Sequence, residues 1–164
     1  MPKPEKYNLQ RLLEVRERAR ESAVEFLAQK RAELAEAERE LTARKKAVVD
    51  CRTAQRTAET EMMEKARGGM KNQEIIIHRQ RLFDLREIEK DLIKAVEQQK
   101  IIVGRTEEEV EKALQLLTEA TKELQAIEKH RENWQKARKI EANRQEQKIG
   151  DEIGAILHER RKFE

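Results

Sequence analysis

The sequence is poor in the residues that build loops, closed cores and cross-links. Its 164 residues include five glycines, two prolines and one cysteine, and aromatic residues make up 3%. Few glycines and prolines argue against a domain with many turns, and few aromatics argue against a closed globular core. A single cysteine excludes a disulfide bond within this sequence.

Long apolar runs and targeting patterns are also lacking. No apolar run exceeds three residues, as in Ile75–Ile77, and charged residues follow Met1 where a signal peptide would place an apolar segment. We therefore expect a soluble, cytoplasmic protein with no direct insertion into a membrane.

Charge, by contrast, is abundant and balanced. Charged residues make up 42% of the chain, with 36 basic and 33 acidic residues and a net charge of +3. Nucleic-acid-binding proteins gather their basic residues on one face. The candidate basic stretch, Lys136 to Arg144, is interrupted by Glu141. We expect solvated helix faces with pairs of opposite charge, and no nucleic-acid partner.

Apolar residues recur in heptads and form two stripes along the sequence. Each stripe, taken together with the smaller residues between its large members, is called a seam. Such repeats predict helices that pair along a narrow apolar face. Gln55 interrupts the first seam. The large positions of the first seam are Leu13, Leu27, Leu34, Leu41, Val48 and Met62, and those of the second are Leu82, Val96, Val103, Val110, Leu117 and Leu124.

Two adjacent glycines, Gly68 and Gly69, separate the seams. Each glycine costs about 1 kcal/mol in a helix relative to alanine, so the pair predicts a turn. We expect one helix at about 7–66, a turn at about 67–72 and a second helix at about 73–158, in a single domain over 1–164. The predicted fold class is all-α, a long antiparallel two-helix coiled-coil hairpin.

The seams suggest how the helices pair. Placing Leu27 opposite Ala113 sets large residues against small ones throughout, which permits close packing. A slip of one heptad also keeps the seams together, so both registers stay open. In the first register Tyr7 lies beside Asn133 and Trp134, and the residues after Trp134 form an overhanging C-terminal helix.

The predicted overhang loses the heptad seam but carries a short apolar stripe. The stripe consists of Ile149, Ile153, Ile156 and Leu157. An unpaired amphipathic stripe is typical of a helix that binds a partner. The alternative is a frayed tail, because such a polar single helix is marginal in water and contains Gly150 and Gly154.

No catalytic, cofactor or metal site is expected. The histidines His78, His130 and His158 lack metal-binding spacing, and Gly68-Gly69 lacks the Lys-Ser/Thr of a phosphate-binding loop. Surface carboxylates with nothing to desolvate them should keep ordinary pKa values. We therefore expect no enzymatic activity.

Two smaller features each have two interpretations. Cys51 lies on the first seam, where it is either a small buried residue or a reactive thiol. Met62, Met63 and Met70 surround the turn, where they either pack the tip of the hairpin or form an adaptable contact surface.

The C-terminal residues resemble the signature of the YscO family of type III secretion proteins. In that family a Trp precedes an Arg-Gln-Glu-Glu-Lys-like run, then Asp-Glu-Met-Gly and Leu-His. Here the corresponding residues are Trp134, Arg144, Gln145, Glu146, Asp151, Ile153 and Leu157, with mild departures at Gln147 and Ile153. The opening, Tyr7 to Leu9, is also similar to that of the family.

The resemblance, which extends to the flagellar FliJ proteins, implies the function. Such proteins resemble the central stalk of rotary ATPases and link the hexameric export ATPase to the export gate protein. The signature residues would contact the ATPase ring. A gate-binding pattern, Phe-xxx-Leu-xx-Ala-xxx-His, matches best at Ile88, Leu92, Ala95 and Gln99.

The resemblance also implies a cellular setting. It implies translocator chaperones as further partners, a role in virulence, and a place at the cytoplasmic face of the inner membrane secretion apparatus. Whether the protein is itself secreted stays open. The alternative function is a generic coiled-coil scaffold that dimerises through its overhang or seam. A stalk should be a monomer in solution, whereas a scaffold should be a stable dimer.

Overall fold

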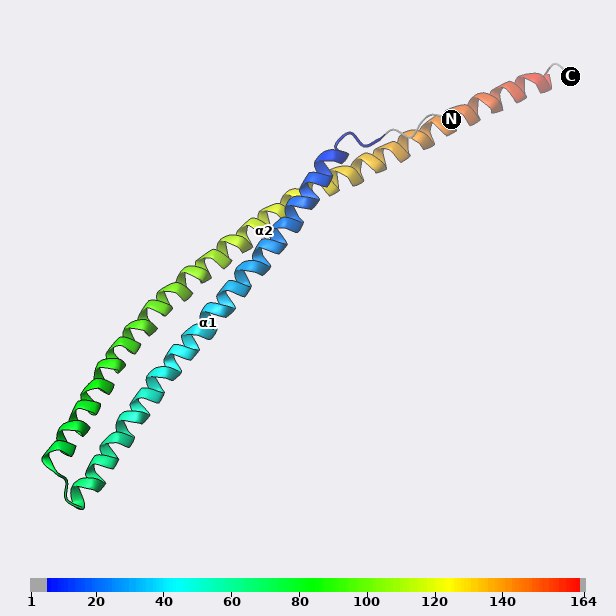
Figure 1. Ribbon diagram of the computed structural model, residues 1–164. Helices are drawn as coiled ribbons and strands as arrows, with labels where there is room; N and C mark the ends of the chain where they lie inside the picture. The colour runs from blue at the N-terminus through cyan, green and yellow to red at the C-terminus, as the bar shows by residue number, and fades with distance from the viewer. Residues whose placement is uncertain (1–5, 163–164) are drawn as a thin grey trace. The chain divides into compact units, whose positions relative to one another are not determined.

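Two long helices make up the computed structural model, which describes residues 6–162 (Figure 1). They are α1 (Gln10–Arg67) and α2 (Asn72–Lys162). No strand occurs over 6–162, so the predicted all-helical class is confirmed, and the arrangement is consistent with a helical hairpin. Neither helix holds an apolar stretch that would span a membrane.

The helix ends differ from the predicted bounds by a few residues. α1 begins at Gln10 because the preceding residues form a turn, in which the Tyr7 carbonyl accepts the Gln10 N–H at 3.2 Å. α2 extends to Lys162, since helix-forming residues continue past position 158 and Gly154 does not end the helix.

The described residues fall into two compact units, each formed by a segment of α1 and a segment of α2. Unit 1 consists of residues 6–24 and 116–162, and unit 2 consists of residues 25–115. The single domain stays a prediction.

Polar contacts between the helices define the register within each unit. Unit 1 has the pair Arg16–Glu123, and unit 2 has Lys30–Glu109, Arg52–Glu89 and a hydrogen bond from Gln99 to the Ala37 carbonyl. The residue numbers rise along α1 as they fall along α2, as in a hairpin. These contacts agree with the register that places Leu27 opposite Ala113, and they disagree with a slip of one heptad.

Buried side chains follow the two seams. Leu13 and Ala58 are each 1% exposed and Ala113 is 0% exposed. The small alanines let the two backbones approach closely, which large residues at every seam position would prevent. The other buried apolar residues are Tyr7, Leu27, Ala37, Val48, Cys51, Val96 and Leu124.

Two glutamines replace apolar residues in the seams, and both are satisfied. The Gln99 side chain is 4% exposed and donates from Nε2 to the Ala37 carbonyl at 3.0 Å. Gln55 donates to the Leu85 carbonyl at 3.3 Å and to Glu89 Oε2 at 2.8 Å. Polar residues in a seam cost stability but favour the one register in which they find partners.

The turn forms where the glycine pair predicts it. The N–H groups of Gly68 and Gly69 donate to the carbonyls of Lys65 and Ala66 at 3.2 and 3.3 Å, which closes α1. Gly69 has a φ of 90°, a left-handed conformation that glycine adopts at little cost. The Glu74 carboxylate then accepts the Lys71 N–H at 3.2 Å, as in a capping box.

Gly69→Ala is expected to destabilise unit 2 by about 1–2 kcal/mol, because an alanine Cβ is strained at this φ. Gly104→Ala is the matched control, for which we expect a change in stability of the opposite sign. Gly104 lies inside α2 with nothing within 4 Å of an added Cβ, so alanine should stabilise the protein by about 0.5–1 kcal/mol. Urea unfolding followed by circular dichroism measures both changes, and shifts of the same sign would contradict the prediction.

Candidate functional site

An aromatic cluster joins the start of the described chain to α2 in unit 1. Tyr7 is 7% exposed, and its ring centroid lies 5.3 Å from that of Trp134. The Tyr7 hydroxyl is 2.7 Å from His130 Nδ1 and donates to it when the imidazole carries its proton on Nε2. The predicted contact between Tyr7 and Trp134 is confirmed, while the one with Asn133 stays a prediction.

This cluster gives His130 a structural partner. His78, His130 and His158 belong to no metal-binding cluster among residues 6–162, where no three His, Cys, Asp or Glu side chains converge. The Arg138 guanidinium carbon lies 6.0 Å from the Trp134 ring centroid, in range of a cation–π contact.

A positively charged hollow of about 610 Å³ lies beside the aromatic cluster. Its cationic lining residues are Lys6, Arg11 and Arg131, and no described lining residue is acidic. The sequence does not reveal this hollow, because acids and bases alternate along the chain. Only the pairing of the two helices brings Arg131 beside Lys6 and Arg11.

The other residues of the C-terminal signature lie on exposed helix. All of residues 135–162 are exposed, and Ile153 and Leu157 are 52% and 55% exposed. Trp134 alone is half-buried, against Tyr7. The exposed signature residues are Arg144, Gln145, Glu146, Asp151, Ile153 and Leu157, and the apolar stripe adds Ile149 and Ile156.

The four predicted gate-binding residues differ in exposure. Ile88 is 50% exposed, Leu92 and Ala95 are half-buried, and Gln99 is buried. The Arg44 guanidinium donates to the Ala95 carbonyl at 3.1 Å. The Gln99 amide is engaged with α1, so of the four only Ile88 offers a largely free side chain.

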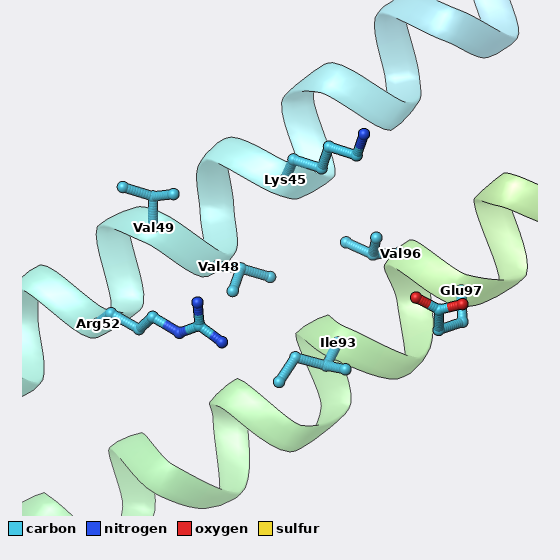
Figure 2. A pocket seen from close by; sticks show the side chains of 7 residues that line it. All are labelled: Lys45, Val48, Val49, Arg52, Ile93, Val96 and Glu97. Atoms are coloured by element: carbon cyan, nitrogen blue, oxygen red, sulfur yellow. The ribbon is translucent and has the colours of Figure 1, made fainter.

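An apolar groove lies between the helices of unit 2 (Figure 2). Figure 2 shows Val48 of α1 and Val96 of α2 pointing toward one another, with Ile93 beside them. The groove has a volume of about 330 Å³, and its other lining residues are Lys45, Val49, Arg52 and Glu97. The heptad pattern does not reveal this groove, because Val49 and Ile93 lie outside the seams.

A second hollow, of about 560 Å³, lies closer to the turn. Met62, Ile76 and Phe83 contribute its apolar surface, and Phe83 is 58% exposed. Met62 is half-buried whereas Met63 is 68% exposed, so the methionines near the turn do not all pack inward. The heptad pattern does not reveal Phe83, an exposed aromatic residue outside the seams.

Cys51 lies in the core of unit 2. It is 8% exposed, and its thiol donates to the Leu85 carbonyl at 3.3 Å. This placement favours the interpretation as a small buried residue over that as a reactive thiol.

Ion pairs shift the pKa of a few groups in unit 2. Hydrogen bonds to Glu33 and Glu109 raise the pKa of the Lys30 ammonium, and the bond from Lys30 lowers the pKa of Glu33. The Arg52 guanidinium, followed by the Gln55 amide, lowers the pKa of Glu89. Glu33 and Glu89 therefore keep their charge into mildly acidic solution, Glu33 in its pair with Lys30 within α1 and Glu89 in its pair with Arg52 across the helices.

Comparison with known proteins identifies relatives by sequence and by fold. The model of a family described as YscO-like protein matches residues 4–163. The solved structure of CT670 from Chlamydia trachomatis, described as a YscO homolog, superposes with a TM-score of 0.79 and 24% identity. The match covers 98% of this chain and 99% of that chain, and at this identity it shows the fold alone. No curated protein matches the chain.

Proposed function

Because the chain belongs to the YscO-like family, which is associated with type III secretion, we propose that it is a non-enzymatic stalk of the secretion apparatus. In this role it links the hexameric export ATPase to the export gate protein at the cytoplasmic face of the inner membrane. The observation that carries the proposal is the exposed helix over 135–162, whose apolar stripe has no covering partner among residues 6–162.

We propose that the two helices form an antiparallel coiled coil and that residues 135–162 are its overhang, which enters the ATPase ring. Ile153 and Leu157 would supply apolar contacts, and Arg144, Glu146 and Asp151 would supply charged ones. Mixed charges give weak contacts of similar strength at several angles, as suits one helix inside a ring of six subunits. Trp134 and the cationic hollow would then lie at the edge of this contact.

The export gate would bind α2 of unit 2 around Ile88, Leu92 and Ala95. Gln99 would act indirectly, because its bond to the Ala37 carbonyl holds this part of α2 against α1. Translocator chaperones are further proposed partners.

Trp134→Ala combined with ending the chain after Ile140 is expected to abolish stimulation of the export ATPase. The variant lacks the exposed stripe and all the signature residues but keeps every buried seam residue of both units. ATP hydrolysis by the purified ATPase is measured with increasing amounts of each protein, and circular dichroism checks that the variant remains helical.

The control replaces an exposed ion pair far from the signature, with Glu36→Ala and Arg39→Ala, and should stimulate normally. Full stimulation by the shortened, folded variant would contradict the proposal. The exposed stripe also favours the alternative of a scaffold that dimerises through it. Light scattering separates the two, since a monomer supports the stalk and a stable dimer supports the scaffold.

A further inference from the structure

The groove of unit 2 differs from the rest of the unit in the residues that lie directly beside the seams, at positions called flanking positions here. Elsewhere in this unit these flanking positions hold ion pairs that bridge the helices, Glu61–Arg81 and Glu59–Arg86. At the groove they hold Val49 and Ile93, which are 59% and 39% exposed. The floor between them is Val48 and Val96, each 8% exposed. The apolar face is therefore wider here than a two-helix pairing needs.

We infer that this groove binds a third helix, an amphipathic helix of a partner protein whose aliphatic stripe is flanked by aspartate or glutamate. Aliphatic residues at flanking positions extend the surface that a helix pair can bury, and a groove between two helices accepts a helix laid along it. Its volume of about 330 Å³ is near the lower limit for small-molecule pockets but accommodates the aliphatic side chains of a docked helix.

The charges around the groove indicate an acidic occupant. Lys45 and Arg52 lie one turn on either side of Val49 along α1, and both line the groove. The two acids nearby are already neutralised, Glu89 by Arg52 at 2.6 Å and Glu97 by Lys100 at 2.7 Å. Lys45 has no ion pair or hydrogen bond among residues 6–162. A carboxylate on the bound helix would pair with Lys45.

A designed peptide tests the inference without knowledge of the natural partner. The probe is a fluorescent 21-residue helical peptide with leucine at heptad positions and glutamate beside them, and the comparison peptide has lysine in place of glutamate. Fluorescence anisotropy with the full chain should show saturable binding of the glutamate peptide, at least about tenfold tighter than that of the lysine peptide.

Variants then locate the binding. Val49→Ser with Ile93→Ser should weaken binding of the glutamate peptide by about tenfold or more, and Lys45→Glu by about three- to tenfold. The matched control removes two exposed aliphatic residues of unit 1, with Val15→Ser and Leu116→Ser, and should leave affinity unchanged. All the replaced residues are exposed, and circular dichroism verifies that each variant is folded.

Three results of the peptide experiment would overturn the inference. They are equal binding of the two peptides, no saturable binding of either, and unchanged affinity in the double serine variant of the groove. Self-association that the serine variant abolishes would also overturn it, because the occupant would then be a second copy of this chain. The test does not depend on the stalk role, since no ATPase or gate protein is present.

Discussion

Leu13→Ala is expected to lower the free energy of unfolding of unit 1 by about 2–5 kcal/mol. Leu13 is the largest side chain that is almost completely buried, at 1% exposed. Truncation removes its contacts with the facing helix and leaves a cavity that two long helices close only in part. Urea unfolding followed by the fluorescence of Trp134, the single tryptophan of the chain, reports on the same unit.

The adjacent residue provides the control for this prediction. Leu12 is 36% exposed and lies outside the seam, so Leu12→Ala should cost less than about 1 kcal/mol. Both changes remove the same atoms from the same turn of α1 and differ only in burial. Equal costs would show that the seam does not stabilise unit 1.

Ala113→Leu is expected to destabilise unit 2 by about 1–3 kcal/mol through overpacking. Ala113 is 0% exposed, and Leu27, 5% exposed, lies opposite it in the register that the Lys30–Glu109 pair indicates. A second leucine would push the helices apart or force both side chains out of their preferred rotamers. Urea unfolding followed by circular dichroism measures the loss, and Ala28→Leu, at an exposed position, is the control.

Exchanging the two residues tests the register directly. If Leu27 faces Ala113, the double variant Leu27→Ala with Ala113→Leu restores one large and one small residue at the contact. Its destabilisation should then be smaller than the sum of the two single changes, by about 0.5–3 kcal/mol. Strict additivity would mean that the two side chains do not touch and that the predicted register is wrong.

The parts of the candidate site that depend only on residues close together in the sequence were predictable. The C-terminal signature and its apolar stripe could be identified from the sequence, because residues three and four apart share a helix face. The aromatic contact between Tyr7 and Trp134 required only the register. The cationic hollow was not predictable, because acidic and basic residues alternate along the sequence. The apolar groove was not predictable either, because an exposed valine such as Val49 resembles the scattered aliphatic residues on the surface of any protein.

By itself the sequence determined the two helices, the turn and the buried stripe. The physical reason is that heptad spacing and the Gly68-Gly69 pair act through neighbouring residues, so no distant contact is needed to interpret them. The tertiary structure alone decided between the two registers, because both bury the seams and only cross-helix pairs such as Lys30–Glu109 distinguish them. It also decided that the Gln99 amide bonds the Ala37 carbonyl and that Val49 and Ile93 line one groove. These facts depend on which residues of the other helix lie opposite.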